Sequence, residues 1–218
     1  MRVIGEGESS AATEMIEKHP ALATTRLATG GTRTTSEAFF LERCRVQLYQ
    51  GHTALHVAAA VYDTAVARAL IDAGADIRAS NRRGAEPIHA AMHGGPGSST
   101  WDPQAQVAMI RLLIQAGADP EALASDGVTP LLRAVRNRCS AAVRELLDAG
   151  VDPNRRNDNG SSAIDLARVT SGRGGTGAPA AKVEQARIIA MLEAVTALFG
   201  IISAGIFLAH AVDGYWSR

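Results

Sequence analysis

The strongest constraint on the fold of this 218-residue chain is an internal repeat of 33 residues. Four similar segments start 33, 43 and 33 residues apart: GHTALHVAA at Gly51, GAEPIHAAM at Gly84, GVTPLLRAV at Gly127 and GSSAIDLAR at Gly160. A second landmark keeps these offsets, in ALIDAGADI at Ala69, LLIQAGADP at Leu112 and ELLDAGVDP at Glu145. Two landmarks in one register predict stacked units, with about ten additional residues inside the second unit.

Each unit has the pattern of two short helices. Glycine, a polar residue and Thr or Pro precede the first helix, which is typical of a turn leading into a helix start. In the second helix, apolar residues such as Val66 and Leu70 recur at helical spacing and predict one buried stripe. We expect the glycines that end these second helices to adopt the left-handed conformation: Gly74, Gly117 and Gly150. One unit cannot bury its stripe alone, so the units must stack.

The first two units carry Thr53-Ala54-Leu55-His56 and Glu86-Pro87-Ile88-His89, and the third has Thr129-Pro130-Leu131 followed by Leu132 instead of histidine. The fourth, Ser162-Ala163-Ile164-Asp165, departs furthest, as a terminal repeat would. These motifs resemble the T-P-L-H-x-A signature of the ankyrin-repeat family over about residues 51–194. The resemblance implies an all-α solenoid of helix-turn-helix units with β-turn fingers and a concave protein-binding surface. It implies a binding module and no enzyme.

The flanking segments complete the predicted organisation. Residues 1–50 are interpreted as an atypical N-terminal helical cap or a degenerate first repeat, and residues 51–194 as repeats starting near 51, 84, 127 and 160. Residues 195–218 are interpreted as an apolar C-terminal helix. Within the cap, one helix is predicted from Ser9 to about Lys18, where His19-Pro20 ends it. A second is predicted near residues 36–45.

The apolar helix has two interpretations. Residues 195–212 contain no charged side chain, and as a helix they would span roughly 27 Å, which is marginally the thickness of a membrane core. Tyr215 and Trp216 follow where an interfacial belt would lie. The segment is therefore either a membrane anchor with the repeats facing the cytoplasm or a helix that packs or dimerises. The start of the chain lacks the pattern of a secretory signal, so we expect a cytoplasmic protein whose oligomeric state stays open.

Charge and motif content argue against several functions. The chain has 22 basic and 22 acidic residues, so the overall charge predicts no nucleic-acid partner. The glycine-rich residues 171–179 lack the Gly-Lys-Ser/Thr ending of a phosphate-binding P-loop. Cys44 and Cys139 have no catalytic or zinc-binding pattern around them, and we expect buried thiols. We predict no catalytic residue and no cofactor.

Histidines form two H-x-x-x-H pairs, His52 with His56 and His89 with His93. Histidines four residues apart on a helix can bind a metal. Neither HExxH nor a suitably spaced third acidic ligand occurs, and buried polar groups generally find hydrogen-bond partners. In the family that the chain resembles, the histidines at the positions of His56 and His89 make hydrogen bonds that brace loops. We therefore predict structural histidines and no metal site.

The candidate partner-binding residues come from arginine distribution and from the inserts. Residues 133–173 hold eight arginines against five acids, and two inserts, at 94–103 and 171–179, are expected to emerge at one edge of the stack. Aromatic residues such as Trp101 often anchor interfaces. The resemblance places Arg82, Arg83, Arg155 and Arg156 on fingers. It places Arg136 and Arg138 at the end of a helix on the concave face. The candidates are Arg82, Arg83, Trp101, Arg136, Arg138, Arg155 and Arg156, and they suit an acidic protein of unknown identity, with ordinary solvated charge as the alternative.

Overall fold

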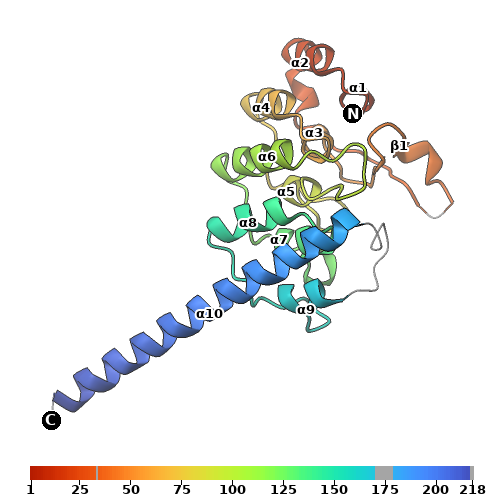
Figure 1. The fold of residues 1–218 in the computed structure, drawn as a ribbon. Coiled ribbons are helices and arrows are strands. Elements are labelled where there is room, and N and C mark those ends of the chain that lie inside the picture. The colour runs from red at the N-terminus through yellow and green to blue at the C-terminus, as the bar shows by residue number, and fades with distance from the viewer. Residues whose placement is uncertain (33, 170–178, 217–218) are drawn as a thin grey trace.

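A computed structural model describes residues 1–218 apart from residues 33, 170–178 and 217–218, with side chains described up to residue 197 (Figure 1). Most described elements are short helices, and three are 3₁₀ turns. In chain order they are α1 (Arg2–Gly5), α2 (Ser9–Lys18), η1 (Pro20–Leu22), η2 (Glu37–Phe39), β1 (Phe40–Leu41), β2 (Val46–Gln47), α3 (Ala54–Ala60), α4 (Thr64–Asp72), α5 (Pro87–Ala90), α6 (Pro103–Gln115), η3 (Ser125–Gly127), α7 (Pro130–Arg136), α8 (Ser140–Asp148), α9 (Ala163–Arg168) and α10 (Pro179–Trp216).

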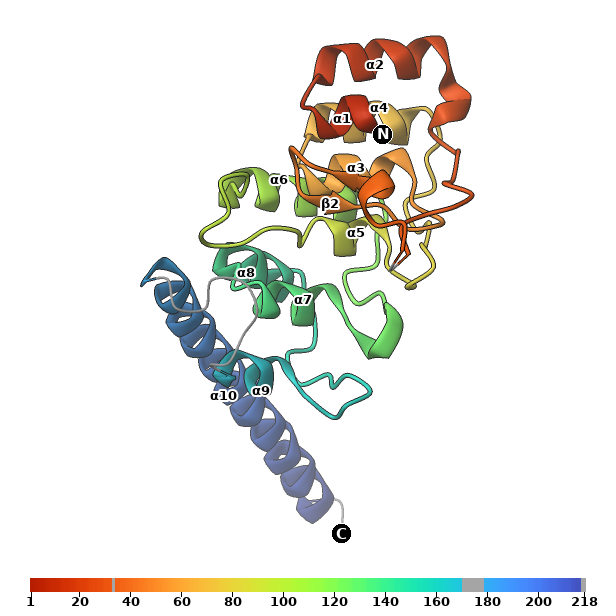
Figure 2. The same ribbon diagram turned by 90° about the vertical axis from the view of Figure 1, so that its right-hand side faces the viewer.

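The described α-helices form two layers along the stack (Figures 1 and 2). The inner layer contains α1, α3, α5, α7 and α9, each in contact with the next, and the outer layer contains α2, α4, α6, α8 and α10. Each inner helix also contacts the outer helix that follows it, so the repeating unit is a helix pair. The all-α solenoid predicted from the repeat is confirmed, and the pair α1–α2 precedes the first recognisable unit.

The core lies between the two layers. α3 is buried along its whole length, because its alanines allow the neighbouring helices to approach closely. The largest fully buried side chains come from both layers and include Leu55, Leu70, Ile88, Leu113, Leu131, Leu146, Ile188 and Leu192. Burial of one such side chain contributes about 1.5–3 kcal/mol to folding, so stacking of the pairs supplies the driving force that a single unit lacks.

Glycine ends the outer helices as predicted. Gly74, Gly117 and Gly150 have φ angles of +88°, +101° and +86°, in the left-handed region that glycine adopts without a Cβ clash. After α4, the backbone N–H of Ala75 donates to the carbonyl of Leu70 at 2.9 Å, which closes the last turn of the helix. The three turns are therefore equivalent, which keeps successive helix pairs in register.

The helix predicted near residues 36–45 is wrong. The chain forms the 3₁₀ turn η2 followed by an antiparallel hairpin, in which Phe40 pairs with Gln47 and Leu41 with Val46. Buried Val46 and Leu48 alternate with partly exposed neighbours, and this two-residue period favours a strand over a helix. We call residues 28–50 the hairpin insert. Hydrogen bonds between Leu27 and the backbone of residues 51 and 52, both 2.8 Å, close its base.

The insert in the second unit ends as the sequence predicts. Asp102 accepts hydrogen bonds from the backbone N–H groups of Gln104 and Ala105, at 2.9 and 3.0 Å, and Pro103 is the first residue of α6. The predicted partner of this insert, at residues 171–179, lies outside the described residues except for Pro179, where α10 begins.

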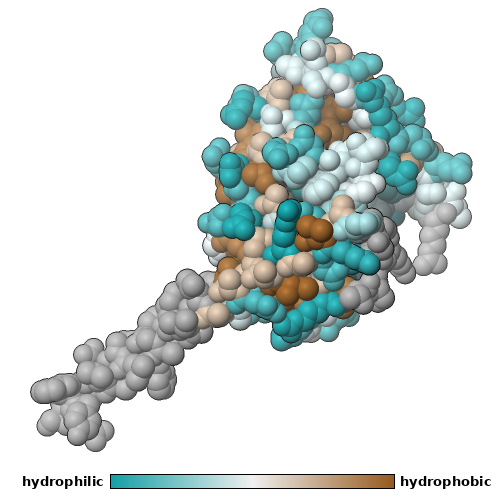
Figure 3. Space-filling model, viewed as in Figure 1, coloured by the Kyte–Doolittle hydropathy of each residue, from teal (hydrophilic) through white to brown (hydrophobic). Residues whose placement is uncertain are grey.

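α10 is the outer helix of the last pair and continues past residue 194 without a break, beyond the repeats (Figure 1). Ile188 and Leu192 are buried, against α8 and α9. Within the part of the chain searched, no helix is sufficiently long and apolar to cross a membrane. Most of the apolar segment 195–212 lies beyond the described side chains. On the face of Figure 3, brown apolar patches are interrupted by hydrophilic residues along the described repeats.

Candidate partner-binding surface

A hollow of about 400 Å³ lies between the inner helices, the fingers and the hairpin insert. Its floor comes from α3, α5 and α7, which contribute His56, His89 and Arg133. The fingers add Asn81 and Arg83, and the hairpin insert adds Arg45, Gln47 and Tyr49. The four arginines that line it are Arg45, Arg83, Arg133 and Arg136, and we call it the basic hollow.

Acidic residues do not compensate this charge. No Asp or Glu lines the basic hollow, and within the described residues none of its four arginines forms an ion pair. Burial, together with the nearby charges of Arg136 and Arg83, lowers the pKa of Arg133 to about 10, so its guanidinium is still charged at neutral pH. The hollow therefore concentrates positive charge in a partly enclosed space.

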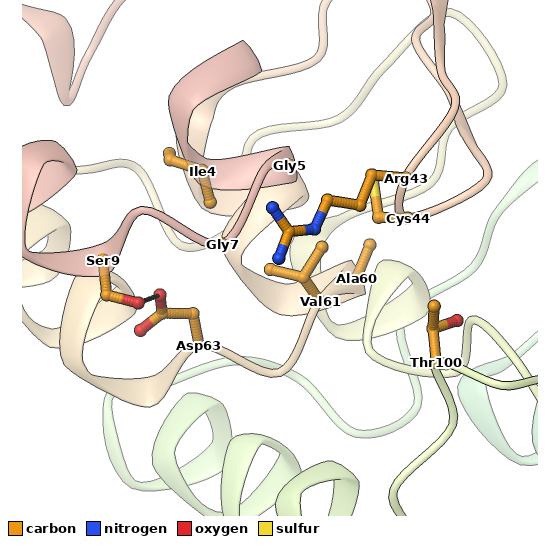
Figure 4. A pocket seen from close by; sticks show the side chains of 10 residues that line it. All are labelled: Ile4, Gly5, Gly7, Ser9, Arg43, Cys44, Ala60, Val61, Asp63 and Thr100. Carbon is orange, nitrogen blue, oxygen red and sulfur yellow. Dashed lines mark hydrogen bonds between the residues drawn. The ribbon is translucent and has the colours of Figure 1, made fainter.

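The hairpin insert is fixed against the stack on two sides. Tyr49 lies beneath the guanidinium groups of Arg83 and Arg82, whose Cζ atoms are 4.6 and 5.2 Å from the ring centroid. The carbonyl of Cys44 accepts a hydrogen bond from Nε2 of His93 at 3.2 Å. On the other side of the hairpin turn, Arg43 extends over Val61 into a smaller hollow of about 330 Å³ beside α1 (Figure 4). These contacts hold one wall of the basic hollow in place.

Comparison with known proteins agrees with this architecture. The family model for ankyrin repeats in many copies matches residues 113–167, and the model for a single ankyrin repeat matches residues 50–82. The chain is an ankyrin-repeat protein. It is 33% identical to neurogenic locus notch homolog protein 1 of Danio rerio and 35% identical to neurogenic locus notch homolog protein 2 of Homo sapiens, each over 114 residues. Each match covers 52% of this chain and 4% of the relative.

The signature histidines of this ankyrin-repeat protein link one unit to the next. Nδ1 of His56 accepts a hydrogen bond from the backbone N–H of Thr53 at 3.2 Å, so Nε2 carries the proton and donates to the carbonyl of Ala85 at 3.0 Å. His89 is bonded in the same way to the backbone of Glu86 and Val128, at 3.2 and 3.1 Å. The predicted bracing role is confirmed. Among the described residues, no three potential metal ligands lie together.

The structure separates the predicted finger arginines into two groups. Arg155 forms an ion pair with Glu121 at 2.8 Å and Arg156 with Asp165 at 3.0 Å. Arg82 and Arg83 instead face Tyr49, and Arg82 also donates to the carbonyl of Gly31 at 2.5 Å. Fingers two units apart therefore present different surfaces, and the uncompensated charge lies on the finger of the second unit.

The remaining candidates lie near the insert of the second unit. Arg136 lines the basic hollow and, with Arg138, a second hollow of about 560 Å³ beside Gly94–Ser99. Trp101 is partly buried and donates from Nε1 to Gln106 Oε1 at 3.0 Å, so it folds back onto α6. Cys139 is buried, and burial raises the pKa of its thiol to about 12, which suits a packed residue. Cys44 is also buried.

Sequence reasoning missed two of the four arginines of the basic hollow, Arg45 and Arg133, and its aromatic residue Tyr49. Arg45 and Tyr49 reach the hollow only because the hairpin insert folds over the inner helices, and no local pattern predicts that. Arg133 carried a signal, because it directly follows Leu132, which stands where the first two units have their signature histidine. Ala90 occupies the same position in the second unit and also lines the hollow. In the second and third units the variable position of the signature therefore faces the concave surface.

Proposed function

We propose that this chain is a non-enzymatic interaction module that binds an acidic protein on its concave face and on the finger of the second unit. Membership of the ankyrin-repeat family supports a protein-binding role. The observation that carries the acidic partner is the group of arginines around the basic hollow without acidic neighbours. Such a surface attracts a partner of opposite charge and suppresses partners of like charge. Arg155 and Arg156 contribute less, since each already has an acid beside it.

Charge reversal on the finger tests this proposal. We expect the double substitution Arg82→Glu with Arg83→Glu to reduce capture of partner proteins from a nuclease-treated lysate by at least about tenfold, because two attractive contacts become repulsive. Quantitative mass spectrometry of the captured proteins measures the loss. Both side chains are exposed, so thermal unfolding should change little apart from the lost contacts with Tyr49 and with the carbonyl of Gly31.

A control reverses the same number of charges elsewhere. Arg68→Glu with Arg144→Glu changes two exposed arginines of the outer helices α4 and α8, away from the concave face. This variant should keep the captured proteins of the unmodified chain. Equal capture by all three proteins, or equal loss in both variants, would remove the finger from the binding surface.

We propose a membrane-tethered scaffold as the second candidate function. The observation in its favour is the uncharged segment 195–212, which continues α10 away from the repeats (Figure 1). In this proposal the segment anchors the chain in a membrane, and the repeats bind a partner protein from the cytoplasm. The proposal does not change the binding surface described above, because that surface lies on the inner helices and the fingers.

Carbonate extraction separates the two candidates. If residues 195–212 anchor the chain, the full chain should stay in the membrane pellet, while a version ending at Ala194 should be released, because an embedded helix of this length resists extraction. This truncation retains Ile188 and Leu192, so the last helix pair keeps its packing. Release of both proteins would make the segment a packing or dimerising helix instead.

A further inference from the structure

We propose that the basic hollow is a binding site for a phosphorylated side chain of a partner peptide. The proposal rests on the proposed function and narrows it, because it assigns one chemical group to one cavity on the concave face. Four arginines line the hollow, and they come from three separate parts of the chain. Arg83 comes from a finger, Arg133 and Arg136 from α7, and Arg45 from the hairpin insert. Converging arginines are the usual means by which proteins recognise phosphorylated residues.

Arg133 is the central residue of this site. Nη1 donates one hydrogen bond, to the carbonyl of His89 at 3.2 Å, which fixes the guanidinium on the floor of the hollow. A guanidinium has five N–H donors, so most of its donors are not used by this bond. Burial, together with repulsion from Arg136 and Arg83, makes the charge of Arg133 unfavourable in the free protein. An anion bound beside Arg133 would relieve that repulsion and accept hydrogen bonds from the remaining N–H groups.

A phosphoryl group suits the hollow better than a carboxylate. It carries nearly two negative charges at neutral pH and three oxygen acceptors, whereas a carboxylate carries one charge and two oxygens. Several positive charges and no acidic residue line the walls. A dianion therefore neutralises more of the arginine charge than a monoanion does. The volume of about 400 Å³ admits a side chain with its phosphoryl group and excludes a folded surface.

A second hollow explains why the phosphoryl group would belong to a peptide. It has a volume of about 560 Å³ and shares Arg45, His93, Arg136 and Asn137 with the basic hollow. Gly94–Ser99 and Arg138 also line it. A free phosphate would leave this adjoining space empty, whereas a peptide would place the residues next to its phosphorylated side chain there.

The contacts that support the hollow give it a defined shape before a ligand binds. Arg83 is held over Tyr49, and the side chain of Asn137 donates to the carbonyl of Met92 at 2.5 Å. The hydrogen bond from His93 to Cys44 connects the hairpin insert to the segment that follows α5. Such preorganisation lowers the entropy lost on binding, and it favours one arrangement of the guanidinium groups.

Isothermal titration of the full chain with three pentapeptides tests the proposal. The probes are Ala-Ala-X-Ala-Ala in which X is phosphoserine, glutamate or serine, all at one ionic strength because salt screens charge interactions. We expect the phosphoserine peptide to bind with a one-to-one stoichiometry and at least about tenfold more tightly than the glutamate peptide. Arg133→Gln and Arg136→Gln should each weaken phosphoserine binding by at least about tenfold. Arg144→Gln, on the outer helix α8, should leave it unchanged.

Other outcomes would overturn the proposal in distinguishable ways. Equal binding of the phosphoserine and glutamate peptides would make the hollow a general acidic site and would leave the proposed function intact. Tighter binding of inositol trisphosphate than of the phosphoserine peptide would assign the hollow to an inositol phosphate instead of a peptide. If Arg133→Gln fails to fold, the exposed Arg136 still gives the decisive comparison. Unchanged binding by Arg136→Gln would place the phosphoryl group elsewhere.

Discussion

Lowering the pH from 7 to 5 should remove about 5–6 kcal/mol from the free energy of unfolding, enough to unfold a protein of ordinary stability. Burial lowers the pKa of His52 to about 3 and the pKa values of His56 and His89 to about 4, from an ordinary value of 6.5. Between these values and 6.5 the unfolded chain binds more protons than the folded chain. The free energy of unfolding therefore falls as the pH falls, by about 2 kcal/mol for each histidine at pH 5.

Hydrogen-bond geometry explains why these histidines resist protonation. Nδ1 of His56 and of His89 accepts from a backbone N–H group, so a proton on Nδ1 would place two donors against each other. The opposite ring nitrogens bond to carbonyls of the next unit, at Ala85 and Val128. Protonation would thus break the contacts between units, and the loss of stability would spread along the stack.

Urea denaturation at pH 7, 6 and 5 measures the effect, and the chain offers a matched substitution. The third unit has buried Leu132 at the signature position, so His89→Leu copies an arrangement that the fold already tolerates. This variant should be less stable at pH 7 but should lose about 2 kcal/mol less between pH 7 and 5. His19→Gln changes an exposed histidine and serves as the control. A free energy of unfolding that is constant from pH 7 to 5 would contradict the argument.

The sequence predicts the repeats well because each unit specifies itself locally. The glycines after α4, α6 and α8, the capping Asp102 and the signature histidines all act within a few residues of their own position or on the next unit. The same local rules gave the helix at residues 9–18, which is α2. Where structure depends on neighbours in sequence, periodicity and end signals are therefore sufficient.

The basic hollow could not be predicted in the same way. Its wall is the hairpin insert, whose position depends on contacts between Tyr49 and Arg83 and between Cys44 and His93, which are distant in sequence. The prediction of a helix at 36–45 was wrong for a related reason. Phe39 and Leu41 are compatible with a helix or a strand, and packing against the helix stack decides between the two. Arg82, Arg83, Arg136 and Arg138 were identified from charge alone, and only the folded chain shows which of them lack acidic partners.

The second large effect concerns the last helix pair, which α10 completes. Ile188 and Leu192 are each 1% exposed, on the face of α10 that packs against α8 and α9. Replacing a buried Ile or Leu by Ala costs about 2–5 kcal/mol through lost burial and the cavity that remains. The double substitution Ile188→Ala with Leu192→Ala should therefore release α10 and expose the apolar side of α8. Terminal units of a repeat protein open independently, so the earlier helix pairs should stay folded.

Hydrogen exchange of backbone amides can resolve this local opening. In the double variant, amides of α9 and of residues 179–197 should exchange rapidly, with a smaller increase in α8, while those of α3 and α4 should stay protected. Val183→Ala is the matched control, because Val183 lies on the same helix but is 50% exposed, and it should preserve protection throughout.

Unchanged exchange in the double variant would mean that the polar contacts of α10 hold it in place without its apolar face. Those contacts are the hydrogen bonds of Ser140 with Glu184 and of Gln185 with the carbonyl of Ala167, and the ion pair of Arg168 with Glu193. Because Arg168 and Glu193 are exposed, their ion pair contributes at most about 1 kcal/mol, so the apolar contacts should decide whether the last pair stays closed.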